Sequence, residues 1–398
     1  MKKAMLETVF QNIHEGGLRV RYWDGTEFQY GNSEPTFKII FNKEPLLSEL
    51  SDASLALGEF YMDGIIDYEG ELDDLLHIME KNEPLSLSKQ GTMKKFFAAA
   101  VKNLASVADK NEQKRNIHAH YDLGNDFFSL WLDKTMCYSC GYFKTPQDSL
   151  YNAQIQKIDL ILKKLRLEPG QKLLDIGCGW GSLIIRAAEK YGVKALGITL
   201  SEEQYASAAK RIHDAGISNL VDVKLVNYLD LDRDEYQFDR IVSVGMFEHV
   251  GKEYLAKYMQ KVNDLLVDRG LSLLHTLINQ REVITNPWVR KYIFPGGYIP
   301  SLRETYHLFP EFDFRVIHDE SLRMHYVKTL EYWYQNFTQQ LDAVYQKFDK
   351  RFVRMWSLYL QGSAAILRTG NLDLHQILFS KGPINDLPLT LTDVYVQE

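Results

Sequence analysis

The stretch LLDIGCGWGS, residues 173–182, decides the fold of this chain. An apolar run containing Asp175 leads into Gly177, Gly179 and Gly181. Glycines let the backbone turn tightly after a strand and let a ligand approach the main chain closely. The stretch therefore predicts a strand, a tight turn and the start of a helix. On its own it fits a dinucleotide site, a nucleoside site or a purely structural turn.

Two features of this turn narrow the choice of ligand. Asp175 lies at the strand end, before the glycines, where a carboxylate can meet an amino group or another cation. The turn has no basic residue that would neutralise a phosphate. A ligand with a positive head and no phosphate therefore fits better than NAD, and S-adenosylmethionine is such a ligand.

Further apolar runs after this turn predict a sheet. They are rich in Val, Ile and Leu, as buried parallel strands require: KALGITL (194–200), VDVKLV (221–226), FDRIVSV (238–244) and LSLLHTLI (271–278). Two helical patterns between them end at Gly192 and Gly270, which is typical of a helix C-cap. Repeated strand–helix units predict a doubly wound sheet that binds ligands at the carboxyl ends of its strands.

Polar side chains follow two of these strands. Thr199 and Ser201 come after the second strand, with Gln204 further on. Ser201 fits a helix N-cap with Gln204 as its capping-box partner, and it fits a ligand contact equally well. Asn227 and Tyr228 follow the third strand, where an adenine would be flanked, although core packing also explains a tyrosine there.

Residues 1–80 predict a small mixed domain. GGLRVRYWDGTEFQYGN (16–32) alternates around Asp24-Gly25, which indicates a β-hairpin. TFKIIFN (36–42) predicts another strand, and the apolar pattern of 46–66 predicts a helix followed by a helical turn.

Residues 81–115 form a basic linker region with eight basic and three acidic residues, a local charge of +5. Within it, TMKKFFAAAVKNLASV (92–107) places apolar residues at helical spacing beside lysines. This pattern fits an amphipathic segment that lies on anionic lipid. It also fits a linker helix packed between domains, and both interpretations stay open.

Composition limits the class of protein. The 398 residues suggest one large domain and a smaller one, and the net charge of −7 argues against a nucleic-acid partner. Three cysteines are too few for a disulfide framework and fit a reducing cytoplasm. Glu7 interrupts the apolar N-terminal stretch, so a signal peptide is not expected, and no run reaches the ~18 apolar residues of a membrane span.

Nine motifs in order resemble the cyclopropane-fatty-acyl-phospholipid synthases. They are HYDLGNDFFSLWLD (120–133), MCYSCGYF (136–143), LLDIGCGWGS, GITLSEEQ (197–204), SVGMFEHVG (243–251), LLHT (273–276), YIFPGGYIPS (292–301), HYVKTL (325–330) and FVRMW (352–356). The resemblance implies an α/β catalytic domain over 116–398 with a class I methyltransferase-like, doubly wound, mixed seven-stranded sheet. Residues 1–80 resemble the small N-terminal α+β domain of the bacterial phospholipid enzymes, which the related mycolic-acid methyltransferases lack. This favours membrane phospholipid as the substrate.

The resemblance also implies a reaction and its residues. Family members add the methyl carbon of S-adenosylmethionine across a cis double bond of an acyl chain and form a cyclopropane ring, with a bound bicarbonate ion as the base. The bicarbonate ligands would be Cys140, Glu248, His275, Leu277 and Tyr326. Leu277 is a mild departure, since the family commonly has Ile there and uses its backbone.

The cofactor contacts implied by the resemblance lie in three of these motifs and in one further region. They would be Ser139, Gly177, Gly179, Thr199, Leu200, Gln204 and the region of Tyr228. The loop that follows, LDLDRDEYQ (229–237), is longer than usual and blurs the alignment of the adenine contacts.

The chemistry explains why such residues are needed. Attack of the alkene on the sulfonium methyl leaves a carbocation beside an acidic methyl group, so a weak and well-held oxyanion suffices as base. Holding it requires donors such as a His, a Tyr hydroxyl and backbone N–H groups near Cys140. Glu248 would orient the bicarbonate or share a proton with it, because two free anions repel. Without the resemblance, His275 and Tyr326 would be interpreted as core residues, and His249 is interpreted as structural.

An aromatic insert follows the fifth strand. NPWVRKYIFPGGYIPSL (286–302), within an insert of about 279–312, offers Trp288, Tyr292, Phe294 and Tyr298 to cover an acyl channel. We interpret it as a lid with Gly296-Gly297 as a flexible point. A subdomain that only covers the core is the alternative.

The two cysteines of MCYSCGYF form a C-x-x-C pattern. A zinc site would need two more ligands nearby, and a redox pair would start a helix in a different context. We interpret the cysteines as unrelated positions, with Cys137 as a small apolar filler and Cys140 beside the bound anion. No metal site is expected.

Three functions remain in competition. The first is cyclopropanation of phospholipids by a cytoplasmic enzyme that associates peripherally with the inner face of the cell membrane. The resemblance to the bacterial phospholipid enzymes implies that it forms a homodimer. The second is methylation of acyl chains or of a small amine without ring closure. The third is a lipid-binding protein that has kept a nucleoside-binding fold, against which the intact DIGCGWG, Glu248, His275 and Tyr326 argue.

Overall fold

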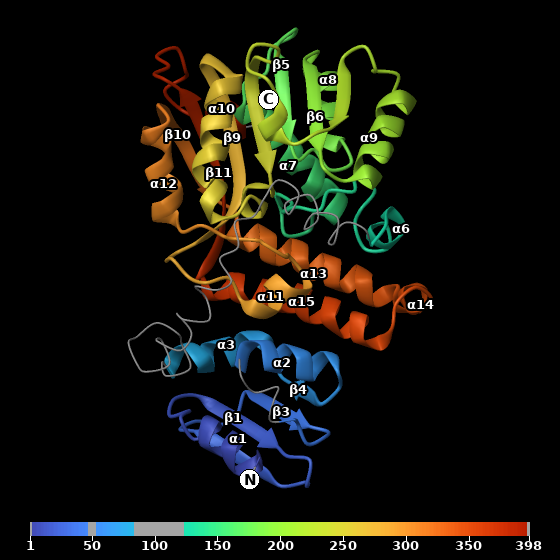
Figure 1. Cartoon of the computed structure of the whole chain (residues 1–398), viewed down its shortest axis with the longest axis vertical. Helices are drawn as coiled ribbons and strands as arrows, with labels where there is room; N and C mark the ends of the chain where they lie inside the picture. Colours follow the sequence, from blue (N-terminus) through green and yellow to red (C-terminus); the bar gives the residue numbers. More distant parts are fainter. Residues whose placement is uncertain (1, 47–52, 83–122, 396–398) are drawn as a thin grey trace. The chain divides into compact units, whose positions relative to one another are not determined.

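The computed structural model describes residues 2–46, 53–82 and 123–395 (Figure 1). Contacts between Cα atoms divide the chain into two compact units. The first comprises Met1–Ala108, Asn286–Ile293 and Leu341–Thr369, and the second comprises the rest. The basic segment 92–107 lies outside the described residues, and so does most of the linker region, so the domain boundaries at 80 and 115 stay predictions.

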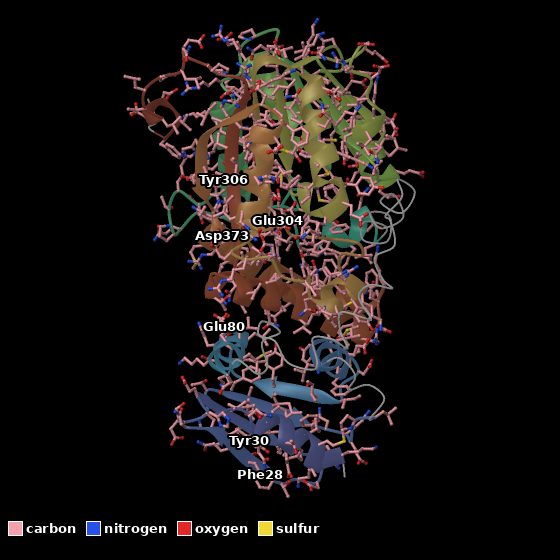
Figure 2. The ribbon with its side chains drawn as sticks, turned by 60° about the vertical axis from the view of Figure 1, so that its left-hand side comes forward. Phe28, Tyr30, Glu80, Glu304, Tyr306 and Asp373 are labelled. Carbon is pink, nitrogen blue, oxygen red and sulfur yellow. The ribbon has the colours of Figure 1, made fainter. Side chains whose placement is uncertain are left out.

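The first unit contains a four-stranded sheet with strand order β2-β1-β3-β4. Its elements are α1 (Lys2–Phe10), β1 (Gly17–Arg21), β2 (Glu27–Gly31), β3 (Phe37–Phe41), α2 (Ala53–Met62), β4 (Ile66–Glu69), α3 (Leu72–Lys81), α11 (Pro287–Tyr292), α14 (Leu341–Tyr345) and α15 (Lys350–Thr369). The predicted hairpin at Asp24-Gly25 is confirmed, because β1 and β2 pair antiparallel from Arg21↔Glu27 outward. Figure 2 labels Tyr30 on β2, whose buried hydroxyl lies 2.9 Å from that of Tyr22.

Two later segments complete the first unit. In α11, Trp288 packs so closely on α2 that a Cβ on Gly58 would lie 2.3 Å from the indole ring. Lys291 and Tyr292 both donate to Glu59 at 2.6 Å. Trp288 and Tyr292 of the predicted lid are therefore packed against α2. From α15, Arg368 pairs with Asp73 of α3 at 2.9 Å.

The second unit holds the larger sheet and its helices. Its elements are α6 (Asn125–Phe128), α7 (Leu150–Lys164), β5 (Lys172–Ile176), α8 (Ser182–Tyr191), β6 (Lys194–Thr199), α9 (Glu202–Asp214), β7 (Val221–Leu225), η2 (Tyr228–Asp230), β8 (Phe238–Val244), η3 (Phe247–His249), η4 (Lys252–Tyr254), α10 (Leu255–Leu265), β9 (Leu266–Asn279), α12 (Leu302–Glu311), β10 (Phe314–Ser321), α13 (Arg323–Gln339), β11 (Leu372–Lys381) and α16 (Thr392–Tyr395).

The seven strands of this sheet have the order β10-β11-β9-β8-β5-β6-β7. Strands β5 to β9 pair parallel, and β11 runs antiparallel to both β9 and β10. The mixed, doubly wound, seven-stranded sheet expected from the sequence is thus confirmed. The strand order reverses beside β5, which places the glycine-rich turn at the point where such sheets bind ligands.

Helices cover both faces of this sheet (Figure 1). Apolar residues of α7, α8 and α9 form one buried core with the strands, including Ile161, Ile184 and Ile212. Because strand–helix–strand crossovers are right-handed in nearly all sheets, the reversal of strand order puts α10 on the opposite face. There it contacts α12.

One boundary predicted from the sequence is wrong. Gly270 does not cap a helix, because α10 ends at Leu265 and the fully buried Leu266 already pairs with Phe238 in the sheet. The residues after it form a bulge, with Arg269 at a φ of 63°. Gly270 is needed there because a Cβ would lie 2.7 Å from the Leu266 side chain. Gly192, by contrast, is confirmed as a left-handed C-cap.

No helix in the described parts of the chain combines enough length and apolar character to cross a bilayer.

Candidate active site

The glycine-rich turn after β5 has a backbone that only glycine adopts easily. Gly177, Gly179 and Gly181 have φ values of 86°, 54° and 83°. These lie in the left-handed region, where other residues are strained. At Gly177 a Cβ would also lie 3.1 Å from the Met246 side chain, so a larger residue there would have to displace Met246, which lines the pocket described next.

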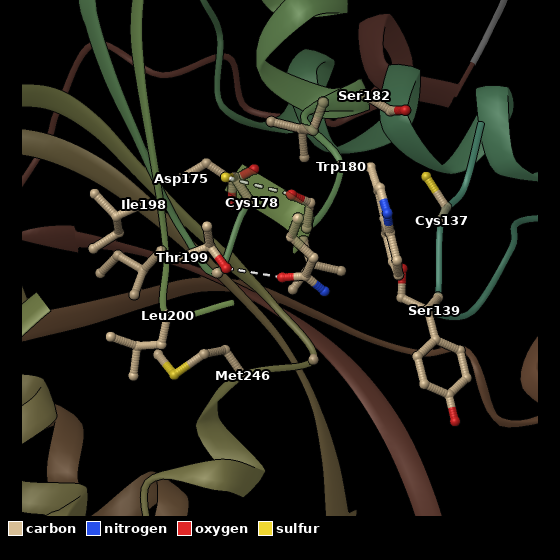
Figure 3. Close-up of a pocket in the computed structure, with 18 of the residues that line it drawn as sticks. Cys137, Ser139, Asp175, Cys178, Trp180, Ser182, Ile198, Thr199, Leu200 and Met246 are labelled. Carbon is tan, nitrogen blue, oxygen red and sulfur yellow. Dashed lines mark hydrogen bonds between the residues drawn. The ribbon is translucent and has the colours of Figure 1, made fainter. Parts of the chain in front are cut away.

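A pocket opens over this turn. Eight of the nine predicted cofactor positions line it: Ser139, Asp175, Gly177, Gly179, Thr199, Leu200, Gln204 and Tyr228. Figure 3 shows Trp180 and Ser139 on one side of the pocket and Thr199, Leu200 and Met246 on the other. The pocket thus presents an indole face opposite the ends of two strands, which suits a flat heterocycle.

Asp175 is a buried carboxyl group in the floor of this pocket. Its side chain is 2 % exposed, and its Oδ1 atom has no hydrogen-bond partner among the described residues. Burial raises the pKa of Asp175 to about 7, and the nearby Lys157 opposes that rise. A buried acceptor of this kind favours a ligand that brings a cationic donor.

Thr199, Ser201 and Gln204 form a local network at the end of β6. Ser201 caps α9 by accepting a hydrogen bond from the Gln204 N–H at 3.3 Å, so the N-cap interpretation is confirmed. The Gln204 side chain does not complete a capping box, because its Oε1 atom accepts from the Thr199 hydroxyl at 2.8 Å. This bond holds Gln204 against the pocket.

Asn227 and Tyr228 separate in the structure. The Asn227 side chain accepts from the Leu229 N–H at 3.0 Å and caps the short helix η2, and Asn227 is not among the pocket-lining residues. Tyr228 lines the pocket, packs against Tyr258, and has a buried hydroxyl without a partner among the described residues.

Lys157 of α7 is a pocket residue that the sequence did not reveal. Its side chain is 2 % exposed, and its ammonium donates to the Ser139 hydroxyl at 2.9 Å. Its charge also acts on Asp175, Cys140 and His275, whose pKa values it lowers. A buried cation therefore lies between the pocket and the second group of predicted residues.

That second group is brought together behind Ser139. Cys140 packs in one buried cluster with Leu322 and Leu374, and Leu277 and Tyr326 pack against this cluster. Glu248 is hydrogen-bonded to Leu277: its Oε1 atom accepts from the Leu277 N–H at 2.6 Å. His275 lies two residues before Leu277 on β9, and therefore on the same face of the sheet.

Two buried polar atoms in this group have no hydrogen-bond partner among the described residues. They are Oε2 of Glu248 and Nε2 of His275. Burial raises the pKa of Glu248 to about 7, while burial and two lysines hold the pKa of His275 well below its usual value. Buried polar atoms normally find partners, so a donor–acceptor ligand is expected at this place.

The cysteine pattern has no joint role in this arrangement. Cys137, Cys140 and Cys178 are all free thiols. Cys140 is fully buried and points to the carbonyl oxygen of Gly141 at 3.1 Å, and burial raises the pKa of its thiol. A thiol held neutral in this way is a poor nucleophile.

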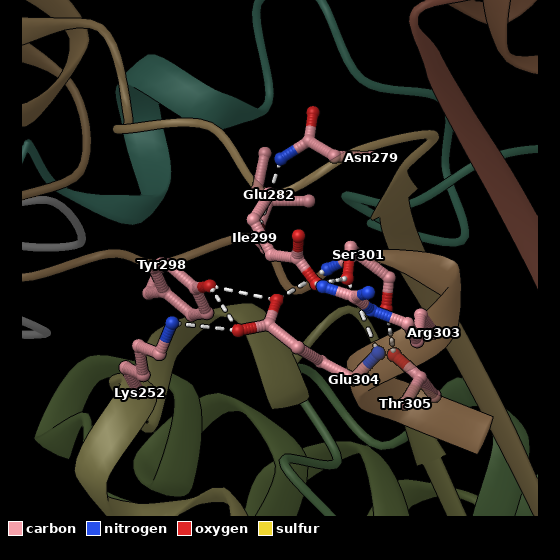
Figure 4. A network of polar contacts seen from close by, with 9 residues as sticks. All are labelled: Lys252, Asn279, Glu282, Tyr298, Ile299, Ser301, Arg303, Glu304 and Thr305. Carbon is pink, nitrogen blue, oxygen red and sulfur yellow. Dashed lines mark hydrogen bonds and ion pairs between the residues drawn. The ribbon is translucent and has the colours of Figure 1, made fainter. Parts of the chain in front are cut away.

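The insert after β9 is tied to the site through Glu248. The Tyr298 N–H donates to the Glu248 carbonyl oxygen at 2.9 Å. Figure 4 shows the Glu304 carboxylate between Lys252, at 2.7 Å, and the Tyr298 hydroxyl, at 2.8 Å. Glu304 also closes a capping box with Ser301. This network fixes the backbone around Glu248.

His249 was interpreted as structural, but it lines the pocket. Its ring packs edge-on to Phe294, and burial lowers its pKa to about 4. Trp180 and Met246 were also not singled out. Their positions inside the quoted motifs were the available signal, since Trp180 follows Gly179 and Met246 lies two residues before Glu248.

Comparisons with known proteins match most of the chain. A model of the family described as mycolic acid cyclopropane synthetase matches residues 108–377, and a model of a domain of unknown function matches residues 5–107. A protein of Pseudomonas putida named "Probable fatty acid methyltransferase" is 36% identical over 403 residues, covering 98% of this chain and 99% of that protein.

Two further relatives carry more specific names. The Escherichia coli (strain K12) "Cyclopropane-fatty-acyl-phospholipid synthase" is 37% identical over 340 residues, 85% of this chain and 86% of that protein. A crystal structure of a mycolic acid cyclopropane synthase complexed with SAH and CTAB has a TM-score of 0.64 and 35% identity, covering 67% of this chain and 98% of that one.

Proposed function

This chain belongs to the mycolic acid cyclopropane synthetase family, and we propose that it transfers the methyl carbon of S-adenosylmethionine to the cis double bond of unsaturated acyl chains in membrane phospholipids, closing a cyclopropane ring. One observation carries the proposal. Ser139 lines the pocket over the glycine-rich turn, and the adjacent Cys140 packs with Leu277 and Tyr326. The sites of the methyl donor and of the proton acceptor would therefore adjoin each other, because the neighbouring residues Ser139 and Cys140 belong one to each.

The pocket residues would bind the cofactor. Asp175 would accept from its amino group, and Trp180 and Leu200, on opposite sides of the pocket, would enclose its adenosine. Sequestering the sulfonium from water in this way strengthens its attraction to nearby dipoles. Ser139, Thr199, Gln204 and Tyr228 are the further contacts we propose, whereas the role of Asn227 would be to shape the turn before Tyr228.

The group behind Ser139 fits a small oxyanion. Glu248 Oε2 is a buried acceptor when ionised and His275 Nε2 is a buried ring atom, and neither is satisfied within the described residues. With Cys140, Leu277 and Tyr326 they would hold a bicarbonate ion, which supplies a weak base when bound. Glu248, with a pKa near 7, can exist in either protonation state at neutral pH and can therefore share a proton with its ligand.

The electron balance of the reaction explains why water must be excluded. The alkene π pair forms a bond to the methyl carbon, and the C–S pair leaves with sulfur to give S-adenosylhomocysteine. The new methyl group then loses a proton, and the electron pair of that C–H bond forms a bond to the cationic carbon. This bond is the third side of the cyclopropane ring. The buried, largely apolar cluster around Leu277 and Leu374 would keep water from trapping the cation.

Phospholipid is the substrate class that we favour. The Escherichia coli and Pseudomonas putida relatives cover 85% and 98% of this chain, so they extend beyond the region shared with the mycolic acid enzymes. We propose that the enzyme works in the cytoplasm at the inner face of the membrane, as a homodimer, with residues 81–115 or the N-terminal domain in contact with lipid.

A second candidate is methylation without ring closure. It is favoured by the name of the Pseudomonas putida relative, a probable fatty acid methyltransferase. The same site would give a ring-free methylated chain if the cation lost a proton from a neighbouring chain carbon, whose C–H pair would then form a new double bond.

One experiment separates the candidates. The protein is incubated with methyl-labelled S-adenosylmethionine and vesicles of unsaturated phospholipid, and the acyl chains are analysed by mass spectrometry. Labelled ring-bearing chains support the proposal, and labelled branched or methylene chains support the second candidate. Absence of label in lipid, with phospholipid retained by the protein, contradicts both and supports a lipid-binding function.

We expect cofactor affinity to depend on pH through Asp175. The ionised carboxylate is the form that binds an amino group. Because the pKa of Asp175 is about 7, cofactor affinity is full above pH 7 and falls as pH decreases through that value. Below that value the fall approaches about tenfold per pH unit. Calorimetric titration with S-adenosylhomocysteine measures it. Asp175→Asn removes the dependence, and Asp222→Asn on the exposed side of β7 keeps it; a flat wild-type profile contradicts the role of Asp175.

We expect Cys140→Ser to keep turnover within about tenfold of the wild type, because a buried neutral thiol makes no bond in the reaction. The serine hydroxyl can still donate to the carbonyl oxygen of Gly141. Initial rates of methyl transfer to vesicles measure the effect. Complete loss of turnover with unchanged cofactor binding would instead indicate a nucleophilic cysteine.

A further inference from the structure

A row of buried polar side chains leads from the sheet interior to His275. Gln376 of β11 is the direct cross-strand partner of His275 on β9, and its Nε2 atom lies 3.1 Å from the His275 Nδ1 atom. On its other side, the Gln376 Oε1 atom accepts from the Lys164 ammonium of α7 at 2.9 Å. Lys164 in turn pairs with Glu320 of β10 at 2.6 Å. His275, Gln376 and Lys164 are all fully buried.

The chemistry of these groups determines which atom donates and which accepts in each contact of the row. An ammonium only donates, so the oxygen of the Gln376 amide must face Lys164. The amide nitrogen then faces His275, and an NH₂ group also only donates. His275 Nδ1 must therefore accept, and in a neutral imidazole the proton lies on Nε2. The low pKa of His275 agrees with a neutral ring.

The orientation of Lys164 is fixed by its own partner. Glu320 accepts from Lys164 and also from the Tyr395 hydroxyl at 2.9 Å, so two donors hold its Oε2 atom. Turning the Gln376 amide over would point its NH₂ group at the ammonium and its oxygen at Nδ1. The NH₂ group and the ammonium would then be two donors facing each other, which no change in the ring repairs. The amide oxygen could accept from Nδ1 only if the ring carried its proton on that atom.

We infer that Gln376 is a positioning residue, which holds His275 in the Nε2–H tautomer. Lys164 in turn fixes the orientation of the Gln376 side-chain amide. The inference rests on the proposed function, in which a small oxyanion is held behind Ser139. The pair His275–Gln376 adjoins the pair Leu277–Leu374 on the same face of the sheet. The Nε2 atom, which has no partner among the described residues, is thereby made a donor for that oxyanion.

The tautomer is measured directly by NMR of protein labelled with ¹⁵N-histidine. Correlations between ring carbon-bound protons and both ring nitrogens distinguish the two tautomers, and His275→Gln assigns the signals by their loss. We expect His275 to carry its proton on Nε2 without any ligand. A proton on Nδ1, or a doubly protonated ring at neutral pH, overturns the inference whatever the activity of the enzyme.

Two variants separate positioning from packing. Gln376→Glu keeps the shape but replaces the donor by a carboxylate, which attracts the proton to Nδ1; we expect turnover to fall about 10²–10³-fold, as for a lost oxyanion donor. Gln376→Met loses both hydrogen bonds but leaves the Nε2–H tautomer accessible, and we expect a fall of about tenfold. A packing role predicts the reverse order, and that order would contradict the inference. Gln346→Glu, at an exposed site, is the matched charge control.

The pH profile gives a second signature of Gln376→Glu. Its carboxylate favours a second proton on His275, while Lys157 and Lys164 on α7 oppose that proton. The imidazolium regains an Nε2–H, so we expect this variant to recover turnover as pH falls and lose it as pH rises. If His275 has the expected tautomer but His275→Gln keeps full turnover, the proposed catalytic site fails while the assignment of the tautomer stands.

Discussion

Glu248→Gln is expected to lower turnover by about 10²–10³-fold, the usual cost of losing one group that contacts a buried oxyanion. The amide oxygen still accepts from the Leu277 N–H, the bond that now measures 2.6 Å, so the backbone around it is preserved. The lost property is proton exchange at the position of Oε2, which no described residue satisfies. Rates of methyl transfer to phospholipid vesicles, with cofactor affinity from calorimetry, measure the effect.

The same variant should be more stable than the wild type at alkaline pH. The folded state raises the pKa of Glu248 from 4.5 to about 7, so the folded protein holds this proton more tightly than the unfolded chain. Stability is therefore lost as pH rises from 4.5 to about 7 and stays reduced above it, by an amount on the order of 3 kcal/mol. Glu248→Gln removes this dependence, whereas Glu253→Gln at an exposed position does not. Unchanged turnover would rule out the proposed role of Glu248.

Lys157→Met should impair both halves of the site. Asp175 loses a nearby cation that favours its ionised form, so cofactor affinity at neutral pH should fall about tenfold. The oxyanion loses a buried positive charge, and turnover at saturating cofactor should fall about 100-fold. Steady-state kinetics with cofactor varied over vesicles of fixed composition separate the two effects.

Lys157→Gln distinguishes charge from hydrogen bonding at this position. Its amide can still donate to the Ser139 hydroxyl, which accepts from Lys157 at 2.9 Å, but it carries no charge. We expect Lys157→Gln to resemble Lys157→Met. Recovery of wild-type kinetics in Lys157→Gln would show that the hydrogen bond alone matters. Lys163→Met, on the same helix, is the control for changes in α7.

The sequence was most informative where function depends on consecutive residues. The strand, the glycines and the positions beside them lie within ten residues of chain, and left-handed φ values at Gly177 and Gly181 explain why only glycine serves there. The alternation of apolar strands and helices was enough for the sheet, because buried parallel strands have a distinctive composition. Gly270 misled the prediction because pairing of Leu266 in the sheet outweighed a local capping signal.

Residues that reach the site from distant elements were not predictable from local patterns. Gln376 is 101 residues from His275 and 212 from Lys164, and nothing in its own neighbourhood distinguishes it from another strand residue. Lys157 is similar, because only the packing of α7 turns that lysine inward. The aromatic insert shows another limit of local patterns, because its composition did not reveal that Trp288 and Tyr292 pack on α2. Its role as a lid stays a prediction.

The composition of the first unit has a consequence for biosynthesis. Its members come from three separate stretches, the last of which ends at Thr369, and the ion pair between Asp73 and Arg368 joins residues 295 positions apart. The ribosome must therefore synthesise most of the 398 residues before this unit can fold completely. Until then the faces of α2 and α3 that receive α11 and α15 are uncovered. Nascent chains stalled before α15 should accordingly be the ones that chaperones and proteases engage.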